Sequence, residues 1–332
     1  MRQLSPRFQA QYRINGDRCP SKPTGILIVM KFVKVILILM LAFAPLMGRS
    51  AVSAQTAEKV AESHAEKGVS PTATEIARVA GFPITNSMVV TWIVALGLII
   101  FAQMATRNIQ AVPSGLQNFC EWLVESLYNF LEGIIGSDLV KRTFWFFATI
   151  FIFILFSNWA GLIPFFGTVG WKETLSDGTQ VFIPWFRGAN ADLNMTMAMA
   201  LVFFACWIYW ALHANGPIGF LKHLFAPKGN PQGWLKPLLI VVFFAVGFLE
   251  IFSILFRPVS LSFRLYGNIF AGENMLETMS NLIPGLGWLL PIPFYFMELL
   301  VGVIQALVFM LLTAVFTMLI MPHDEGHDHA HH

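Results

Sequence analysis

The sequence predicts an all-α polytopic membrane protein with about five transmembrane helices, one amphipathic interfacial helix, and a long tilted helix that pairs with the final one. Two observations lead to this class. Of 332 residues, 56% are hydrophobic and only 12% are charged. The hydrophobic residues gather into runs of about 20, the length that an α-helix needs to cross a bilayer. The formal net charge of +2 is too small to indicate a nucleic-acid partner.

Motifs of soluble enzymes do not occur in the sequence. It has no Gly-rich phosphate-binding loop, nucleophile elbow or dinucleotide fingerprint. The cysteines are Cys19, Cys120 and Cys206, an odd number without metal-ligand spacing, so they indicate neither a disulfide framework nor a zinc site. We therefore expect no cofactor.

Residues 30–54 have the pattern of a secretory signal peptide. Lys31 and Lys34 precede a short apolar core, and small residues end at Ala54, after which we expect cleavage. An uncleaved anchor helix is the alternative, and it is disfavoured because the apolar core is short for a span. The preceding residues 1–29 are basic and are interpreted as an upstream extension outside the fold, either from an unused upstream start or as a mitochondrial presequence.

The membrane domain is expected over residues 84–321, after a polar exported segment at 55–83. Its first elements are a span at 84–104, an amphipathic helix at 113–138, a span at 143–164, a polar loop to residue 190, a span at about 193–212, and a loop at 213–237. The amphipathic helix has apolar residues at helical spacing, with Glu121, Glu125 and Glu132 between them. This pattern favours a helix that lies at the membrane interface.

Residues 238–281 form the unusual segment of the chain. As one helix, these 44 residues would be about 66 Å long, about twice the thickness of the hydrocarbon layer. The second half is too polar to face lipid as an independent span, and Pro258 allows a kink rather than a reversal. We therefore favour one tilted, bent helix over two spans. A last span follows at 292–321, and a His-rich tail at 322–332.

Basic residues beside the spans predict the orientation of the chain. A signal peptide would export the mature N-terminus and leave six basic residues beside the spans in the cytoplasm: Arg107, Lys141, Arg142, Lys222, Lys228 and Lys236. The short outside loop contains only Lys172 and Arg187. The signal and the charge bias therefore agree, and five spans place the C-terminus in the cytoplasm.

Arg264 is the most informative residue, because a guanidinium at membrane depth costs at least about 2.5 to 3.5 kcal/mol and cannot lose its proton. On the final helix, Glu298 and Gln305 are seven residues apart and share a face. Consecutive helices are antiparallel, so a match in depth of Arg264 with Gln305 places Glu273 nearly level with Glu298. This predicts a polar path from the outer face that ends at a fixed positive charge.

Three glutamates surround this arginine in the predicted arrangement. Glu250, fourteen residues before Arg264, falls on nearly the same helical face and suits a second path from the cytoplasm. Glu273 and Glu298 cannot both be ionised at low cost at similar depth, so we expect at least one to carry a proton. The alternative is an ion pair of Arg264 with one glutamate that only fixes helix packing, and the excess of carboxylates argues against it.

The run PVSLSFRLYGNIFAGE at 258–273 closely resembles the signature of subunit a of rotary F-type ATP synthases. Further matches are QALVF at 305–309, SNWAGLIP at 157–164 and ADLN at 191–194, and the resemblance covers about residues 84 to 321 in consistent order. It implies a proton-translocating subunit that is not an enzyme by itself. Together with the export signal, it implies a bacterial inner membrane.

In that family, subunit a stands beside a rotating c-ring of small hairpin subunits, each with a membrane-embedded carboxylate. Two offset half-channels load and unload these carboxylates. The resemblance implies that Arg264 is the essential separator of the two half-channels and that Gln305 is its neighbour. It also implies peripheral stalk subunit b, the rest of the ATP synthase and the lipid bilayer as partners.

The same resemblance assigns the remaining polar residues. Asn268, Glu273 and Glu298 would line the outer half-channel, and Glu250 the cytoplasmic one. Many family members carry a histidine at one of the positions that Glu273 and Glu298 hold here, so this chain departs from the family at its outer half-channel.

Two other classes of function were weighed. An ion-coupled secondary transporter with a midplane Arg/Glu site would be expected to show internal repeats, and the Arg264 segment has no second copy. A structural scaffold would not need glutamates at related depths. The His-rich tail at 322–332 offers ligands for a divalent metal, but a solvated tail is the preferred interpretation, so no metal site is predicted.

The signal-peptide interpretation predicts that the mature chain begins at Gln55. N-terminal sequencing of the chain purified from membranes should find Gln55 as the first residue, because the small residues ending at Ala54 fit a signal peptidase. A purified chain that still begins at Met1 or Met30 would contradict this prediction and reopen the orientation.

Overall fold

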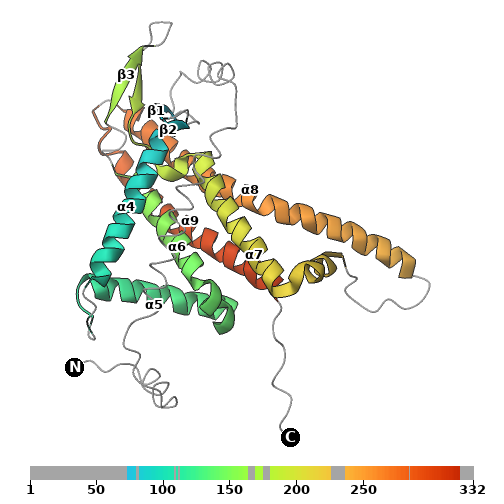
Figure 1. The fold of residues 1–332 in the computed structure, drawn as a ribbon. Coiled ribbons are helices and arrows are strands. Elements are labelled where there is room, and N and C mark those ends of the chain that lie inside the picture. Colours follow the sequence, from blue (N-terminus) through green and yellow to red (C-terminus); the bar gives the residue numbers. More distant parts are fainter. Residues whose placement is uncertain are drawn as a thin grey trace.

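A computed structural model of the chain describes residues 73–79, 82–107, 110, 113–163, 169–174, 180–225, 236–283 and 285–321. Five helices in these ranges are long and apolar enough to cross a membrane, which confirms the predicted all-α polytopic class. Two short β-hairpins lie together at one end of the helices (Figure 1). The predictions for 1–29, 30–54 and 322–332 lie outside the described residues.

The first span is helix α4, Asn86–Thr106. It begins after Thr85, whose side chain accepts a hydrogen bond from the backbone N–H of Met88 at 3.4 Å. An antiparallel hairpin of β1, Glu75–Val79, and β2, Phe82–Thr85, precedes it. The sequence does not predict this hairpin, because strands of four or five residues are too short for a clear alternation of polar and apolar positions.

Helix α5, Leu116–Ile135, crosses the ends of its neighbours instead of running beside them (Figure 1). Leu127 and Leu131 are buried on one face, whereas Trp122 is exposed on another. This crossing, amphipathic helix is the one predicted at the interface. Gly136, at φ 82°, then turns the chain into the second span, α6, Ser137–Gly161, which starts six residues earlier than predicted.

The third span is α7, Leu193–Phe225, and here the predicted loop at 213–237 is in part wrong. Helical structure continues through His213 to Phe225, with one break at Gly216, whose backbone has φ 68° and ψ 163°. Pro217 follows at the start of the second segment, where a missing N–H has no cost. Gly216 and Pro217 therefore redirect a helix, although in the sequence they have the composition of a loop.

The predicted polar loop before α7 also contains structure. Strands β3, Gly170–Thr174, and β4, Gln180–Pro184, form a second antiparallel hairpin, and the 3-10 helix η1, Ala189–Ala191, follows. Asn86 donates a hydrogen bond from Nδ2 to the carbonyl of Pro184 at 3.2 Å. This bond ties the end of β4 to the start of α4 and fixes the segment that continues to η1.

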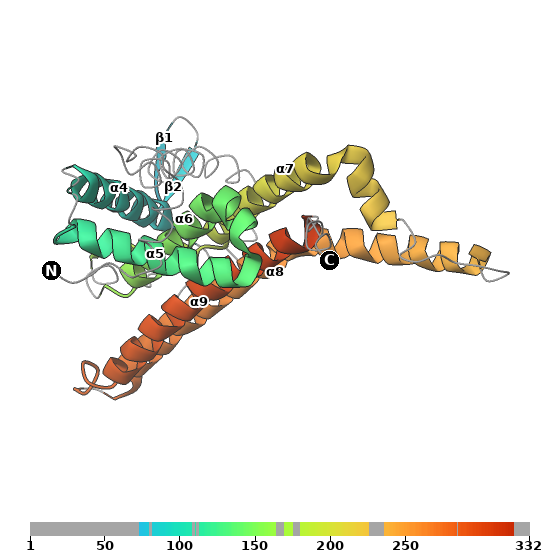
Figure 2. The ribbon, with the colours of Figure 1, turned by 90° about the horizontal axis from the view of Figure 1, so that it is seen from below.

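Helix α8, Lys236–Leu282, is continuous over 47 residues and includes Pro258. This confirms one long helix over two separate spans. Helix α9, Pro291–Ile320, packs antiparallel beside its second half, and the first half of α8 extends past α9 (Figure 2). At 1.5 Å per residue, α8 is about 70 Å long, more than twice the hydrocarbon thickness of about 30 Å.

A core of large aromatic side chains joins α6, α7 and α9. Phe146, Phe147, Phe203, Trp207 and Phe309 are all fully or almost fully buried. The indole N–H of Trp207 donates a hydrogen bond to the carbonyl of Phe316 at 3.0 Å, so the core also fixes the register between α7 and α9. Helix α8 then packs on this bundle from one side.

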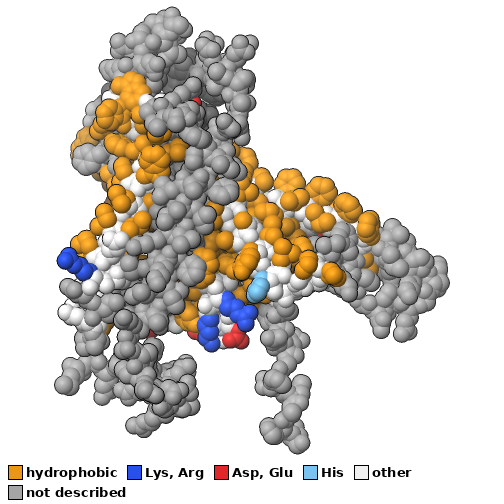
Figure 3. Space-filling view, in the orientation of Figure 1, with side chains coloured by type: hydrophobic (Ala, Val, Ile, Leu, Met, Phe, Trp, Pro, Cys, Tyr) orange, Lys and Arg blue, Asp and Glu red, His pale blue; other side chains and the backbone are white. Residues whose placement is uncertain are grey.

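On the face shown in Figure 3, the basic side chains of the described residues gather at the end of the molecule where α5 lies. Arg107 follows the last turn of α4, and Lys141 and Arg142 lie in the first turns of α6, all three exposed. Hydrophobic side chains cover most of the visible helices between this end and the hairpins. The charge distribution thus distinguishes one end of the bundle from the other.

Gly216 provides a test of the break in α7. Its φ of 68° and ψ of 163° belong to a region that is essentially restricted to glycine, so Gly216→Ala should destabilise the chain by roughly 1–3 kcal/mol. The matched control is Gly219→Ala, where a Cβ would make only an ordinary contact of 3.6 Å with Asn215. Thermal unfolding in detergent should show a lower midpoint for the first variant alone. Equal midpoints would contradict the break.

Candidate functional site

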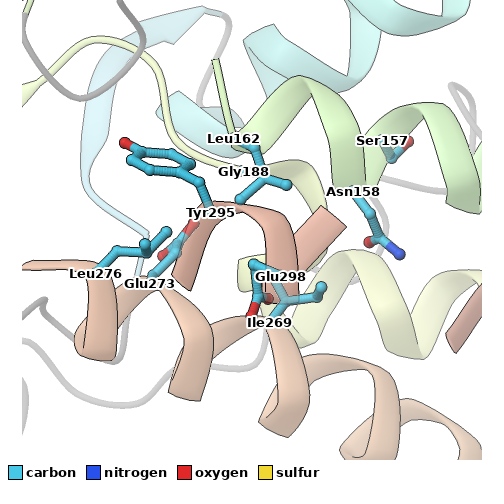
Figure 4. A pocket seen from close by; sticks show the side chains of 10 residues that line it. Ser157, Asn158, Leu162, Gly188, Ile269, Glu273, Leu276, Tyr295 and Glu298 are labelled. Atoms are coloured by element: carbon cyan, nitrogen blue, oxygen red, sulfur yellow. The ribbon is translucent and has the colours of Figure 1, made fainter. Parts of the chain in front are cut away.

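A cavity of about 40 Å³ lies between α6, α8, α9 and the segment that joins β4 to η1, and it exceeds the roughly 10–15 Å³ that one water requires. Two glutamates from different helices, Glu273 and Glu298, line it (Figure 4). The lining residues are Ser157, Asn158, Gly161, Leu162, Gly188, Ile269, Glu273, Leu276, Tyr295 and Glu298. The lining therefore combines polar and apolar side chains.

Glu273, on α8, forms an ion pair with Arg187 from the β4–η1 segment. Nε of Arg187 lies 3.4 Å from Oε2 of Glu273, and the two side chains are 6% and 19% exposed. The backbone of Gly188 lies against the other carboxylate oxygen, because a Cβ at Gly188 would sit 2.7 Å from Oε1. The folded-back segment thus holds this carboxylate from two directions.

Glu298, on α9, is only 5% exposed and reaches across to α8. A Cβ at Gly272 would overlap its carboxylate, so the two helices approach closely at this glycine. Gly272 directly precedes Glu273, and the predicted match in depth of Glu273 with Glu298 is therefore found. Oε1 of Glu298 is buried and has no hydrogen-bond partner among the described residues.

Gln305 and Asn268 form the next polar contact along the two helices. Nδ2 of Asn268 donates a hydrogen bond to Oε1 of Gln305 at 2.7 Å, and Gln305 is 4% exposed. The sequence predicts Gln305 level with Arg264, whereas in the structure Gln305 accepts its hydrogen bond from Asn268, one turn later on α8. Asn268 and Arg264 are about 6 Å apart along α8. The side chain of Asn268 spans this offset by reaching toward α9.

Arg264 is exposed on α8, and within the described ranges no carboxylate lies at ion-pair distance from it. The alternative of a packing ion pair between Arg264 and a glutamate is thus not found, because Glu273 pairs with Arg187. Asn268, one turn further along α8, is also exposed. The structure leaves this positive charge on an outward face, next to the polar contact with α9.

Glu250 lies away from the other predicted site residues. It is half-buried and is fourteen residues, or about 21 Å, before Arg264 along α8. Between the two lies Arg257, whose guanidinium carbon is 4.4 Å from the ring centre of Phe316 and 5.5 Å from that of Trp207. The structure therefore brings Glu273 together with Glu298, and Asn268 together with Gln305. Glu250 and Arg264 take part in neither contact.

Sequence reasoning missed three polar residues of the site: Arg187, Asn158 and Asn190. Nδ2 of Asn190 donates to Oδ1 of Asn158 at 2.6 Å, and Nδ2 of Asn158 donates to the carbonyl of Gly302 at 3.1 Å. Asn158 lies within the matching run SNWAGLIP, which is a signal for its importance but not for its partner. Arg187 has the composition of a loop charge, and only its contacts show that it is buried.

The part of the chain that the structure describes contains no group of three or more His, Cys, Asp or Glu side chains able to hold a metal ion. The cavity brings together two carboxylates and the phenol of Tyr295, with one guanidinium beside them. This arrangement can hold water and pass a proton between buried oxygen atoms.

Comparisons with known proteins agree on one family. The family model described as ATP synthase A chain matches residues 88–318. ATP synthase subunit a of Gloeobacter violaceus is 36% identical over 243 residues, which cover 73% of this chain and 86% of that protein. The subunits a of Helicobacter hepaticus and Citrifermentans bemidjiense are 31% and 34% identical, with 90% and 85% of their lengths covered.

Gly272 provides a test of the close approach between α8 and α9. Gly272→Ala should lower the midpoint of thermal unfolding, because its Cβ overlaps the Glu298 carboxylate and overpacking costs about 1–3 kcal/mol. In a Glu298→Ala background the same change should cost much less. Gly97→Ala, with nothing within 4 Å of its Cβ, is the control. Additive effects of the changes at 272 and 298 would contradict the contact.

Proposed function

The chain belongs to the ATP synthase A chain family, and from this premise we propose that Arg264 separates two proton half-channels beside a rotating ring of carboxylate-bearing subunits. As a subunit a, the chain is a membrane component of the proton-translocating sector and not an enzyme by itself. The single observation that carries the proposal is the exposed charge of Arg264 on a membrane-spanning helix, without an ion-pair partner among the described residues.

The face of α8 around Arg264 suits close approach by a partner. Ser260, Gly267 and Ala271 lie on the same face, at spacings of four, three and seven residues from Arg264, and all are exposed. Small residues allow another helix to come near. A guanidinium at this depth is stabilised when the partner presents a carboxylate, since such charge-assisted pairs are strong. The c-ring, with one carboxylate on each hairpin, is the proposed partner.

The outward direction of Arg264 also separates this proposal from a secondary transporter. A transporter site lies within its own helix bundle, between discontinuous helices. Here α8 is continuous, and the side chain of Arg264 faces away from the bundle. The geometry thus favours a subunit that acts on a moving neighbour.

The cavity with Glu273 and Glu298 is the proposed outer half-channel. Next along α8 comes the hydrogen-bonded pair of Asn268 and Gln305, and then Arg264. Polar groups therefore follow one another from the hairpin end of the bundle toward the separator. Each step is about one turn of α8, a distance that one or two waters span.

Glu250 is the proposed group of the cytoplasmic half-channel. It lies about 21 Å before Arg264 along α8, whereas Glu273 lies about 14 Å after it. The two glutamates are therefore on opposite sides of the separator. A proton that enters by one half-channel cannot reach the other through this chain without passing a permanent positive charge.

The proposed location is a bacterial inner membrane. The exposed Arg107, Lys141 and Arg142 support an orientation with the α5 end of the bundle in the cytoplasm, by the positive-inside rule. The hairpins and the glutamate cavity then face the periplasm, and α9 ends in the cytoplasm. Peripheral stalk subunit b and the remaining subunits of the ATP synthase are the other proposed partners.

Replacing Arg264 by alanine tests the separator role. Arg264→Ala should reduce ATP-driven proton pumping by inverted membrane vesicles to the level seen without ATP, while the complex still assembles, because an exposed side chain contributes little to packing. Arg142→Ala, which removes an exposed arginine outside the pathway, should pump normally. Normal pumping by an assembled Arg264→Ala complex would refute the separator role.

A further inference from the structure

We infer that Arg187 holds Glu273 as a permanent anion and thereby makes Glu298 the proton-carrying group of the outer half-channel. The inference rests on the proposed function and assigns different roles to two glutamates that the sequence treats alike. Arg187 acts in it as a positioning residue. It enters the site from the β4–η1 segment, outside the two helices that carry the glutamates.

The surroundings of Arg187 require a negative charge at Glu273. The arginine side chain is 6% exposed, and its guanidinium lies 5.9 Å from the ring centre of Phe270, on the same helix as Glu273. A guanidinium cannot lose its proton, so burial leaves a charge that must be compensated. Glu273 lies within ion-pair distance at 3.4 Å. Protonation of Glu273 would remove this compensation, and the pair therefore resists it.

The surroundings of Glu298 are different. Within the described ranges, no Lys or Arg lies at ion-pair distance from it, and its buried Oε1 has no hydrogen-bond partner. Its carboxylate faces the same cavity as that of Glu273. An ionised Glu298 would be a second, uncompensated negative charge next to the first. Taking up a proton relieves this repulsion, and releasing it remains possible because water has access through the cavity.

The charges around the two glutamates support the division of roles. Helix α6 contributes only uncharged residues to the cavity: Ser157, Asn158 and Gly161. Besides Glu273 and Glu298, the charged or titratable groups near these two glutamates in the described chain are Arg187, Asp192, Tyr266, Glu277 and Tyr295. Arg187 is the one cation in this set. Arg187 lies beside Glu273, so its positive charge compensates the charge of Glu273 and not that of Glu298.

The test compares ATP-driven proton pumping against pH in inverted vesicles that contain the assembled ATP synthase. Arg187→Gln should lower the rate about tenfold near neutral pH and change the pH profile, because Glu273 is then free to bind a proton. The double variant Arg187→Gln/Glu273→Gln should recover much of the rate, since both charges are removed together. Arg187→Lys should keep the shape of the wild-type profile at a reduced rate. Glu298→Gln should abolish pumping.

Each other result has a definite meaning. A wild-type rate and profile for Arg187→Gln would overturn the inference, and so would a double variant no better than the single one. If Arg187→Gln does not assemble, the double variant is compared with Glu273→Gln, and equal rates overturn the inference. Pumping by Glu298→Gln with none by Arg264→Ala would refute the carrier role alone. Pumping by both would refute the proposed function itself.

Discussion

The constraint on which this structure depends is that an arginine in the membrane keeps its charge. In the described chain, Arg187, Arg257 and Arg264 are each accommodated differently. Arg187 is buried against a carboxylate, Arg257 lies over two aromatic rings, and Arg264 is exposed without an ion partner. The first two fix helices and loops of this chain to one another. In the proposed function, the third is the charge that faces another molecule.

The close packing of glycine residues allows Arg187 and the two buried glutamates to come together. Gly188 and Gly272 each lie against a carboxylate where a side chain would intrude, and Gly161 lies against Gly188. These contacts bring α6, α8, α9 and the β4–η1 segment to one point. Helices in a membrane lack a strong hydrophobic drive to associate, so small residues and buried polar contacts supply much of their specificity. The cavity that holds both glutamates therefore depends on residues without functional groups.

Sequence periodicity predicted those parts of the site that lie on single helices. The separations of Glu273 from Arg264 and of Gln305 from Glu298 gave the facing glutamates, because residue spacing along a helix converts directly to depth. It did not predict the ion pair of Arg187 with Glu273, 86 residues apart, because a contact between distant segments leaves no period in either one. The break at Gly216 and both hairpins were missed for a related reason. Short segments rich in Gly, Pro and polar residues have the same composition whether they form loops, strands or helix breaks.

The length of α8 has a geometric consequence for the route of an ion. Its apolar part, Val242–Leu282, has 41 residues and is therefore about 60 Å long. To remain in a layer of about 30 Å, it must lie about 60° from the membrane normal. Glu250 and Glu273, about 35 Å apart along this helix, then differ by about 17 Å in depth and by about 30 Å sideways. If these glutamates mark the two proposed half-channels, the openings are displaced more along the membrane than across it. Most of the proposed route is then lateral, and a stationary chain needs a carrier that travels in the membrane plane.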